Sequence, residues 1–157
     1  MENIKVSKQG YDSLRKNLES LKEELARLGK YKNKIAAENG DVWHDNNDFE
    51  QTEIQERRLM RQISDLRLRI ANAEIIEESN SANVVRFGAI VELTISGDDF
   101  SEDITILFSD SDEKSEYSKI SANSPIGKVI FNQKAGFEGE YEVNGNKMKA
   151  RINKIRI

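Results

Sequence analysis

The segment GDVWHDNNDF, residues 40–49, gathers side chains that could do chemistry. Its polar and aromatic groups are Asp41, Trp43, His44, Asp45, Asn46, Asn47 and Asp48, and they include the only tryptophan and the only histidine of the chain. Calcium binding by an EF-hand loop requires glycine at the sixth position of that loop. Counted from Asp41 or from Asp45, the sixth position is Asn46 or Glu50, so the EF-hand interpretation is excluded.

The composition describes the kind of chain that has to position this segment. Its 157 residues suffice for one or two small domains, and 33% of them are charged. The absence of cysteine excludes disulfides and thiolate metal sites, and it predicts a reducing, cytoplasmic environment. A net charge of -4 argues against a general nucleic-acid coat protein. No segment approaches the roughly 20 apolar residues of a membrane span, so we expect no membrane partner.

The segments on either side of residues 40–49 have the period of long amphipathic helices. Apolar residues recur every three or four positions, as they do in a coiled coil. The first segment has them at Tyr11, Leu14, Leu18, Leu21, Leu25, Leu28 and Ile35, and the second at Phe49, Leu59, Ile63, Leu66, Ile70 and Ala73. Neither segment contains proline, and Ser7 can cap the first helix. We therefore expect two long helices in a hairpin domain, residues 1–79.

One antiparallel register satisfies both apolar stripes. It pairs Leu28 with Leu59, Leu25 with Ile63, Leu21 with Leu66, Leu18 with Ile70 and Leu14 with Ala73, so that the residue numbers of each pair sum to 87 or 88. The chain then folds back near residues 43 and 44, inside the acidic segment. Thirty residues per arm would carry the acids roughly 45 Å from the base of the helices. The predicted hairpin is a rod with carboxylates at its tip.

The same register predicts a basic band about 20 Å short of the tip. It sets Arg27 level with Arg61 and Lys30 level with Arg58, with Lys34 and Arg57 close by. Two interpretations stay open: a solvated face whose cations pair with nearby glutamates, or a patch that contacts nucleic-acid phosphates. At the tip, His44 is either a metal or phosphate ligand or a solvated loop side chain. Trp43 is better explained as a packing lid than as a base-stacking platform.

Beyond residues 79–81 the pattern becomes that of a small β-dominated domain, residues 80–157. Residues 84–95 are rich in β-branched and apolar side chains and end in the turn 96–99, with residues 104–108 as a hairpin partner. Residues 141–143 and 148–152, joined by the turn 144–146, predict a second hairpin. We interpret Asp98, Asp99 and Asp103 as turn residues rather than metal ligands and assign them no function.

The only proline lies between these two hairpins, in Asn123-Ser124-Pro125-Ile126. Together with Gly127, this stretch predicts a rigid turn that leads into a short helical segment. A proline followed by isoleucine could also form a docking surface. We therefore expect Ser124, Pro125 and Ile126 on an exposed turn.

Four features, taken in order, make the chain resemble the Gre family of bacterial transcript-cleavage factors. They are the start Ser7-x-x-Gly10, the pair Gly40-Asp41 on a coiled-coil hairpin, Phe87-Gly88-Ala89, and Asn123-Ser124-Pro125-Ile126. The likeness covers essentially the full chain. It implies an α+β fold, in which an N-terminal antiparallel coiled-coil hairpin is followed by a C-terminal β-rich domain similar to FKBP-type prolyl isomerases.

The resemblance also implies a partner and an activity. Gre-like factors bind RNA polymerase, with the C-terminal domain on the rim of the secondary channel and the coiled coil inside it. The 3′ end of a backtracked nascent RNA lies in that channel. The tip acids are thought to help hold a second Mg²⁺, so that the polymerase hydrolyses its own transcript. The chain would then be no enzyme itself, would bind no cofactor alone, and would share Mg²⁺ with the polymerase active site; we expect a monomer.

The family pattern Gly-Asp-x-x-Glu-Asn-x-Glu-Tyr transfers to the tip residue by residue. Asp41 matches its first acid, Asp45 and Asn46 match the Glu-Asn after one inserted residue, and Asp48-Phe49 match the Glu-Tyr. The resemblance thus implies that Asp41 and Asp45 are metal ligands in the polymerase complex, assisted by Asn46. If the rod enters the channel, the basic band would lie beside the extruded RNA, so we expect nucleic-acid contacts at Lys30, Lys34, Arg57 and Arg58. The resemblance implies polymerase docking at Ser124, Pro125 and Ile126.

The tip departs from this pattern because it is one residue longer and carries aspartate in place of glutamate. The alternative function is therefore a Gre-like regulator that inhibits the polymerase without stimulating cleavage. A prolyl isomerase is suggested only by the fold analogy, and a fold does not carry function. A coiled-coil adaptor unrelated to transcription would leave the acidic tip unexplained.

Overall fold

The computed structural model describes residues 3–39, 47–78 and 82–157. The chain divides into two compact units, one formed by Asp12–Asn72 and the other by Met1–Tyr11 together with Ala73–Ile157. The boundary expected from the sequence, between residues 79 and 80, lies outside the described residues. None of the helices in the described ranges is long and apolar enough to cross a membrane.

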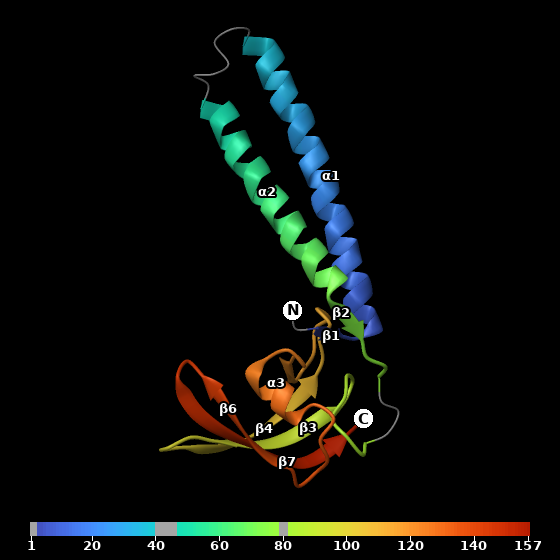
Figure 1. The fold of residues 1–157 in the computed structure, drawn as a ribbon, viewed down its shortest axis with the longest axis vertical. Helices are drawn as coiled ribbons and strands as arrows, with labels where there is room; N and C mark the ends of the chain where they lie inside the picture. Colours follow the sequence, from blue (N-terminus) through green and yellow to red (C-terminus); the bar gives the residue numbers. More distant parts are fainter. Residues whose placement is uncertain (1–2, 40–46, 79–81) are drawn as a thin grey trace. The chain divides into compact units, whose positions relative to one another are not determined.

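Two long antiparallel helices form the hairpin (Figure 1). Helix α1 spans Lys8–Asn39 and helix α2 spans Asn47–Ala71. As predicted, Ser7 caps α1, because its hydroxyl oxygen accepts a hydrogen bond of 2.9 Å from the backbone N–H of Gly10. At the other end of the hairpin, Asp48 and Glu50 stand in the first turn of α2, where negative charge is favourable.

The predicted register of the hairpin is confirmed. Leu25 and Ile63 line one hollow between the helices, and Leu21 and Leu66 line another. Lys32 on α1 forms an ion pair with Glu56 on α2, and these two residue numbers also sum to 88. The predicted fold-back point, residues 43 and 44, lies outside the described residues.

The predicted helical pattern is wrong at the end of the second segment. Helix α2 ends at Ala71, and Ala73, expected opposite Leu14, begins strand β2 (Ala73–Ile75). This strand pairs in parallel with β1 (Ile4–Val6), and the pairing continues as the N–H of Ile76 donates to the carbonyl of Val6. A pairing between segments some seventy residues apart leaves no mark on local periodicity, so the sequence pattern missed it.

The second unit is built on a five-stranded sheet with strand order β5-β4-β3-β7-β6. The hairpin of β3 (Ile90–Ser96) and β4 (Ser101–Phe108) confirms the first predicted pairing, although residues 84–89 are not strand. Strands β6 (Glu138–Val143) and β7 (Asn146–Arg156) confirm the second. Their turn has positive φ at Asn144 and Gly145, which suits a tight two-residue hairpin. The short strand β5 (Ser118–Ile120) runs parallel to β4 and was not predicted.

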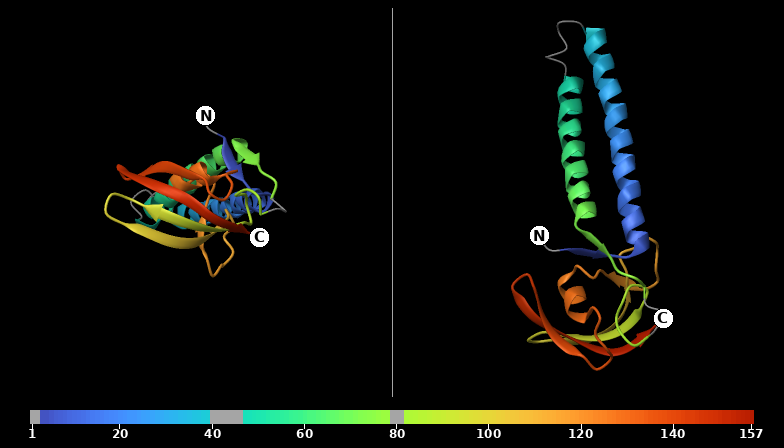
Figure 2. Two further views of the ribbon diagram at one scale, coloured as in Figure 1. Left: turned by 90° about the horizontal axis from the view of Figure 1, so that it is seen from below. Right: turned by 45° about the vertical axis from the view of Figure 1, so that its right-hand side comes forward.

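One face of this sheet carries a closed apolar core. Helix α3 (Pro125–Ile130) packs against β6 and β7 on that face, as the two views in Figure 2 show. The fully buried side chains of the core include Phe87, Val91, Leu93, Ile106, Phe108, Ile130 and Ile152. These side chains come from β3, β4, β7 and α3 and from the segment before β3, so the core joins elements far apart in the sequence.

Candidate functional site

The sequence-predicted metal ligands cannot be placed from this structure. Asp41, Asp45 and Asn46, together with Trp43 and His44, lie outside the described residues. Within residues 3–39, 47–78 and 82–157, the structure brings together no group of three His, Cys, Asp or Glu side chains that could hold a metal ion. The interpretation of Asp103 as a turn residue is wrong: it lies in β4 opposite Thr94, and its carboxylate accepts a hydrogen bond from the Thr94 hydroxyl across the β3–β4 hairpin.

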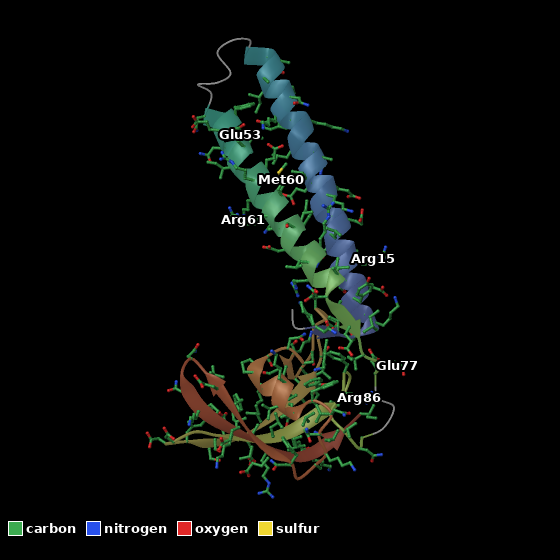
Figure 3. All side chains as sticks on the ribbon, viewed as in Figure 1. Arg15, Glu53, Met60, Arg61, Glu77 and Arg86 are labelled. Atoms are coloured by element: carbon green, nitrogen blue, oxygen red, sulfur yellow. The ribbon has the colours of Figure 1, made fainter. Side chains whose placement is uncertain are left out.

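A cluster that the sequence reasoning missed lies near the acidic segment. The Nζ atom of Lys32 lies 2.8 Å from Oε2 of Glu56 and 3.3 Å from Oε1 of Glu53 (Figure 3, in which Glu53 is labelled). The same ammonium lies 5.2 Å from the centroid of the Phe49 ring, a cation–π distance. We call Lys32, Phe49, Glu53 and Glu56 the Lys32 cluster. The signal was available, because the predicted register already sets residue 32 level with residue 56.

The Lys32 cluster is more enclosed than the surface around it. The side chains of Lys32 and Glu56 are each 23% exposed, and Phe49 is buried beside them. The hydrogen bond to Glu56 is the largest cause of a raised pKa for the Lys32 ammonium, which therefore stays charged well above neutral pH. Next to the cluster, Thr52 is also buried, and its hydroxyl donates to the backbone carbonyl of Asp48.

The basic band divides into paired and unpaired cations. Lys34 pairs with Glu38 on α1 at 3.7 Å, and Arg57 pairs with Glu53 on α2 at 4.0 Å. Lys30 and Arg58 are exposed, and neither takes part in an ion pair found in the described part of the chain. The ion pairs of Lys34 and Arg57 fit the solvated-face interpretation, and contact with nucleic-acid phosphates stays a prediction for all four cations. Arg61, also exposed, lies one turn along α2 from Arg58.

The expected docking turn is only partly exposed. Pro125 is exposed at the first position of α3, whereas Ile126 is half-buried against the core. The Ser124 hydroxyl caps α3: it accepts a 3.1 Å hydrogen bond from the N–H of Gly127 and donates at 2.7 Å to the carbonyl of Ser121. The expectation of three exposed residues is therefore corrected to one, because capping and core packing use the other two side chains.

The first residue of this motif binds the N-terminal strand. The side-chain oxygen of Asn123 accepts a hydrogen bond from the backbone N–H of Lys5 at 2.9 Å, and its amide nitrogen donates to the carbonyl of the same residue at 2.7 Å. One side chain thus satisfies both backbone groups of an edge position in β1. Asn123 has a structural role in this fold.

The start Ser7-x-x-Gly10 is explained by Asp110, a partner that the sequence did not reveal. One carboxylate oxygen of Asp110 accepts from the backbone N–H of Ser7 at 2.7 Å, and the other accepts from the Ser7 hydroxyl at 2.6 Å. A Cβ atom at position 10 would collide with the same carboxylate, so only glycine fits without a shift. Both residues of the motif therefore hold residues 7–10 against Asp110.

The comparisons with known proteins agree along the chain. Residues 79–157 match the family described as "Transcription elongation factor, GreA/GreB, C-term". Transcription elongation factor GreA of Thermosipho africanus is 32% identical over 157 residues, which cover 99% of this chain and 98% of the relative. GreA of Thermotoga neapolitana is 30% identical over 137 residues, or 87% of this chain and 86% of the relative. The crystal structure of Thermus aquaticus Gfh1 is 24% identical and covers 100% of both chains with a TM-score of 0.47.

Two separate findings decide the family. The match at residues 79–157 spans half of the chain, and the similarity to the two GreA proteins extends through the helical hairpin as well. The order of elements, a long helical region followed by a β-sheet domain, is the one that the resemblance implied. The chain belongs to the GreA/GreB family of transcription elongation factors.

Proposed function

We propose that this elongation factor binds RNA polymerase at the secondary channel and stimulates hydrolysis of backtracked RNA by the polymerase. The observation that carries the proposal is the confirmed hairpin register. Because α1 ends at Asn39 and α2 begins at Asn47 beside it, the segment with Asp41 and Asp45 connects two antiparallel helices. A helical hairpin with carboxylates in its connecting segment can deliver them into a narrow channel.

The tip residues fit the chemistry of Mg²⁺ but supply too few ligands to hold it alone. Aspartate carboxylates are hard oxygen donors, the type that Mg²⁺ prefers, and this ion takes six ligands in octahedral geometry. Asp41 and Asp45 would complete a ligand set that the polymerase leaves open, and Asn46 would orient a water molecule or the RNA. When bound, the metal would lower the pKa of a coordinated water and stabilise charge on the phosphate. The factor itself is then no hydrolase.

The other predicted residues have supporting roles in this proposal. Lys30 and Arg58, with Lys34 and Arg57 beside them, would contact phosphates of the extruded RNA. Pro125 would dock on the polymerase, with Ser124 shaping the turn and Ile126 fixing it to the core. We further propose that the protein acts as a monomer in the cytoplasm, with RNA polymerase and the nascent RNA 3′ end as its partners.

The decisive experiment uses purified factor and a deliberately backtracked elongation complex. Shortening of the RNA from its 3′ end is measured with the wild-type protein and with Asp41→Asn, which keeps size and hydrogen bonding but removes charge. We expect the variant to bind the polymerase normally while its maximal cleavage rate falls by about 10²-fold or more, as for the loss of a metal ligand. Asp48→Asn, in the first turn of α2, serves as the comparison and should change the rate far less.

The longer, aspartate-containing tip favours one second candidate, a secondary-channel regulator without cleavage activity. Shorter carboxylates on a longer segment would have to reach the same metal, and Mg²⁺ tolerates little error in ligand geometry. If the wild-type protein binds the polymerase but no RNA is shortened at any Mg²⁺ concentration, cleavage stimulation is excluded. The regulator then becomes the function, and elongation complexes supplied with nucleotides should extend their RNA more slowly when the factor is present.

A further inference from the structure

The Lys32 cluster differs from the other ion pairs described on the hairpin. Lys22 pairs with Glu19, Lys34 with Glu38 and Arg57 with Glu53, and each of these pairs lies within one helix. Lys32 instead joins α1 to α2 through two carboxylates one turn apart. An ion pair within one helix supports that helix, whereas a pair between helices constrains how one helix slides along the other.

The apolar seam alone does not fix that sliding. The leucines of α1 recur every three or four residues, so a shift by one turn brings new apolar pairs together. Leu18, Leu21, Leu25 and Leu28 are only half-buried, so the cost of such a shift falls mainly on the buried residues Leu59, Ile63 and Leu66 of α2. A repeated seam of this kind needs a polar contact to select one register.

The Lys32 cluster supplies that selection. Glu53 and Glu56 lie one turn apart, and the next positions along the same side of α2 are Phe49 before them and Met60 after them, which carry no carboxylate. A slip of one turn would therefore leave the half-buried ammonium beside one glutamate and one apolar side chain instead of two glutamates. Losing a partner of a half-buried charge costs more than losing an exposed ion pair.

The position of the cluster connects register to function. Lys32 lies seven residues before Asn39, about 10 Å along the helix axis, and Phe49 lies in the first turns of α2. Among the described residues, the cluster therefore holds the last ion pair between the helices before the segment that carries Asp41 and Asp45. Ile35 and Phe49 are both buried, so apolar packing accompanies the ion pairs at this end of the hairpin.

We propose that Lys32 is a positioning residue for transcript cleavage: by locking one register of α1 and α2, it sets where the ends of the acidic segment are held. The inference rests on the proposed function, since it assumes that Asp41 and Asp45 act in cleavage. It adds a residue whose role is not contact with RNA, metal or polymerase. Because the pKa of Lys32 is raised, its contribution persists below the ordinary value of 10.5 and is lost only as the pH rises through the raised value. The ion pairs of Lys32 with Glu53 and Glu56 are thus retained throughout the pH range of a transcription assay.

The test separates binding from cleavage. Cleavage of backtracked RNA is measured against factor concentration for the wild type, Lys32→Met, Lys32→Arg and Glu56→Gln. We expect Lys32→Met to lower the maximal rate by about 10-fold to 10²-fold, the effect of misplacing a reacting group by about 1 Å. The half-maximal concentration should change less than about twofold. Lys32→Arg keeps the charge and can bond both carboxylates, so it should recover most of the rate.

The matched control is Lys22→Met. Lys22 also lies on α1 and also forms an ion pair, but its partner Glu19 is on the same helix and both side chains are more exposed than Lys32. This variant removes the same charge from the same helix and should leave the maximal rate unchanged. Circular dichroism on each variant verifies that the helices are formed.

A second measurement reads the register directly. The chain contains no cysteine, so spin labels can be attached at Asn33→Cys and Gln55→Cys without removing any native thiol. Both positions are exposed, and they are level in the confirmed register. We expect one distance in the wild type, and in Lys32→Met a second, longer distance, because one helix is then displaced along the other by about one helical turn, 5.4 Å.

The outcomes distinguish this inference from the proposed function. A wild-type protein that produces no cleavage overturns the proposed function, and the role of Lys32 in cleavage falls with it. A wild type that cleaves, with Lys32→Met equally active, overturns the role of Lys32 alone. Suppose that Lys32→Met cleaves more slowly but keeps the wild-type spin-label distance, and that Lys32→Arg does not recover the rate. The register lock would then also be overturned, because Lys32 would act by a direct contact in the polymerase complex and not by fixing the register of the helices.

Discussion

The helical hairpin and the sheet unit are stabilised in different ways. In the sheet unit, side chains such as Val91, Leu93 and Phe108 are completely buried in one cluster. In the hairpin, Leu59, Ile63 and Leu66 of α2 are buried, but the leucines of α1 are only half-buried, because two helices alone leave part of the seam between them open to solvent. Apolar packing therefore determines the shape of the sheet unit, while the hairpin depends more on a few polar links such as the Lys32 cluster. Under the proposed function this difference is useful, because a docking domain benefits from rigidity and a hairpin that delivers side chains needs a defined register.

The largest expected effect tests this difference by truncating one apolar side chain in each unit. Phe108→Ala should destabilise the sheet unit by about 3–5 kcal/mol, because a fully buried ring leaves a cavity. Leu25→Ala should destabilise the hairpin less, by about 2 kcal/mol, since this side chain is only partly buried. Amide hydrogen exchange measures the opening free energy of each unit separately.

Leu68→Ala is the control for the loss of a leucine from a helix. Its side chain is 50% exposed on α2, and its truncation should change the exchange rates little. Equal effects of Phe108→Ala and Leu25→Ala on their own units would mean that the hairpin seam is as closed as the sheet core. The contrast between the two units would then be wrong.

The sequence predicted the parts of the fold that depend on local patterns. The apolar period gave the helices and their register, and Asn144-Gly145 marked the turn between β6 and β7. The missed features are pairings between distant segments: β1 with β2, β5 with β4, and the hydrogen bonds of Ser7 with Asp110. Asp110 stands among several acids and serines, and no local signal distinguishes the one carboxylate that meets Ser7.

The features of the candidate site also divide into those that local chemistry predicts and those that depend on distant segments. The exposure of Pro125 and the cap at Ser124 follow from the chemistry of a helix start, and the sequence indicated both a turn and a helix. The burial of Ile126 depends on a core assembled from β6 and β7, so it could not be predicted locally. The Lys32 cluster could have been predicted, because the register sets Lys32 level with Glu56. The roles of Asp41, Asp45 and Asn46 stay predictions from the sequence and the family.

The next largest effect tests the sheet unit as the docking part of the molecule. Pro125→Glu places a charge on the exposed residue of the motif, and we expect binding to RNA polymerase to weaken by about tenfold. The fold should be retained, because acidic residues are favourable in the first turn of a helix. Binding is measured by fluorescence anisotropy of labelled factor with core polymerase.

Two variants control for this substitution. Pro125→Ala keeps a small apolar surface and should weaken binding less than glutamate does. Ala135→Glu adds the same charge at another exposed position of the same unit and should leave binding unchanged. If Pro125→Glu binds as tightly as the wild type, the contact with the polymerase lies elsewhere on the sheet unit.

The smallest expected effect tests whether the hairpin meets RNA through its unpaired cations. Reversing both charges, Lys30→Glu with Arg58→Glu, should lower the affinity for complexes with extruded RNA by a few-fold at low salt and less at high salt, because phosphate attraction is screened. Loss of two phosphate contacts should reduce the slope of log affinity against log salt by about 1.4. The matched control reverses the exposed Arg15 and Lys16, which alters the net charge of the hairpin equally but lies far along α1 from Lys30. An equal loss with complexes that lack extruded RNA would show that these cations contact protein, and the hairpin would then take part in the docking that is proposed for the sheet unit.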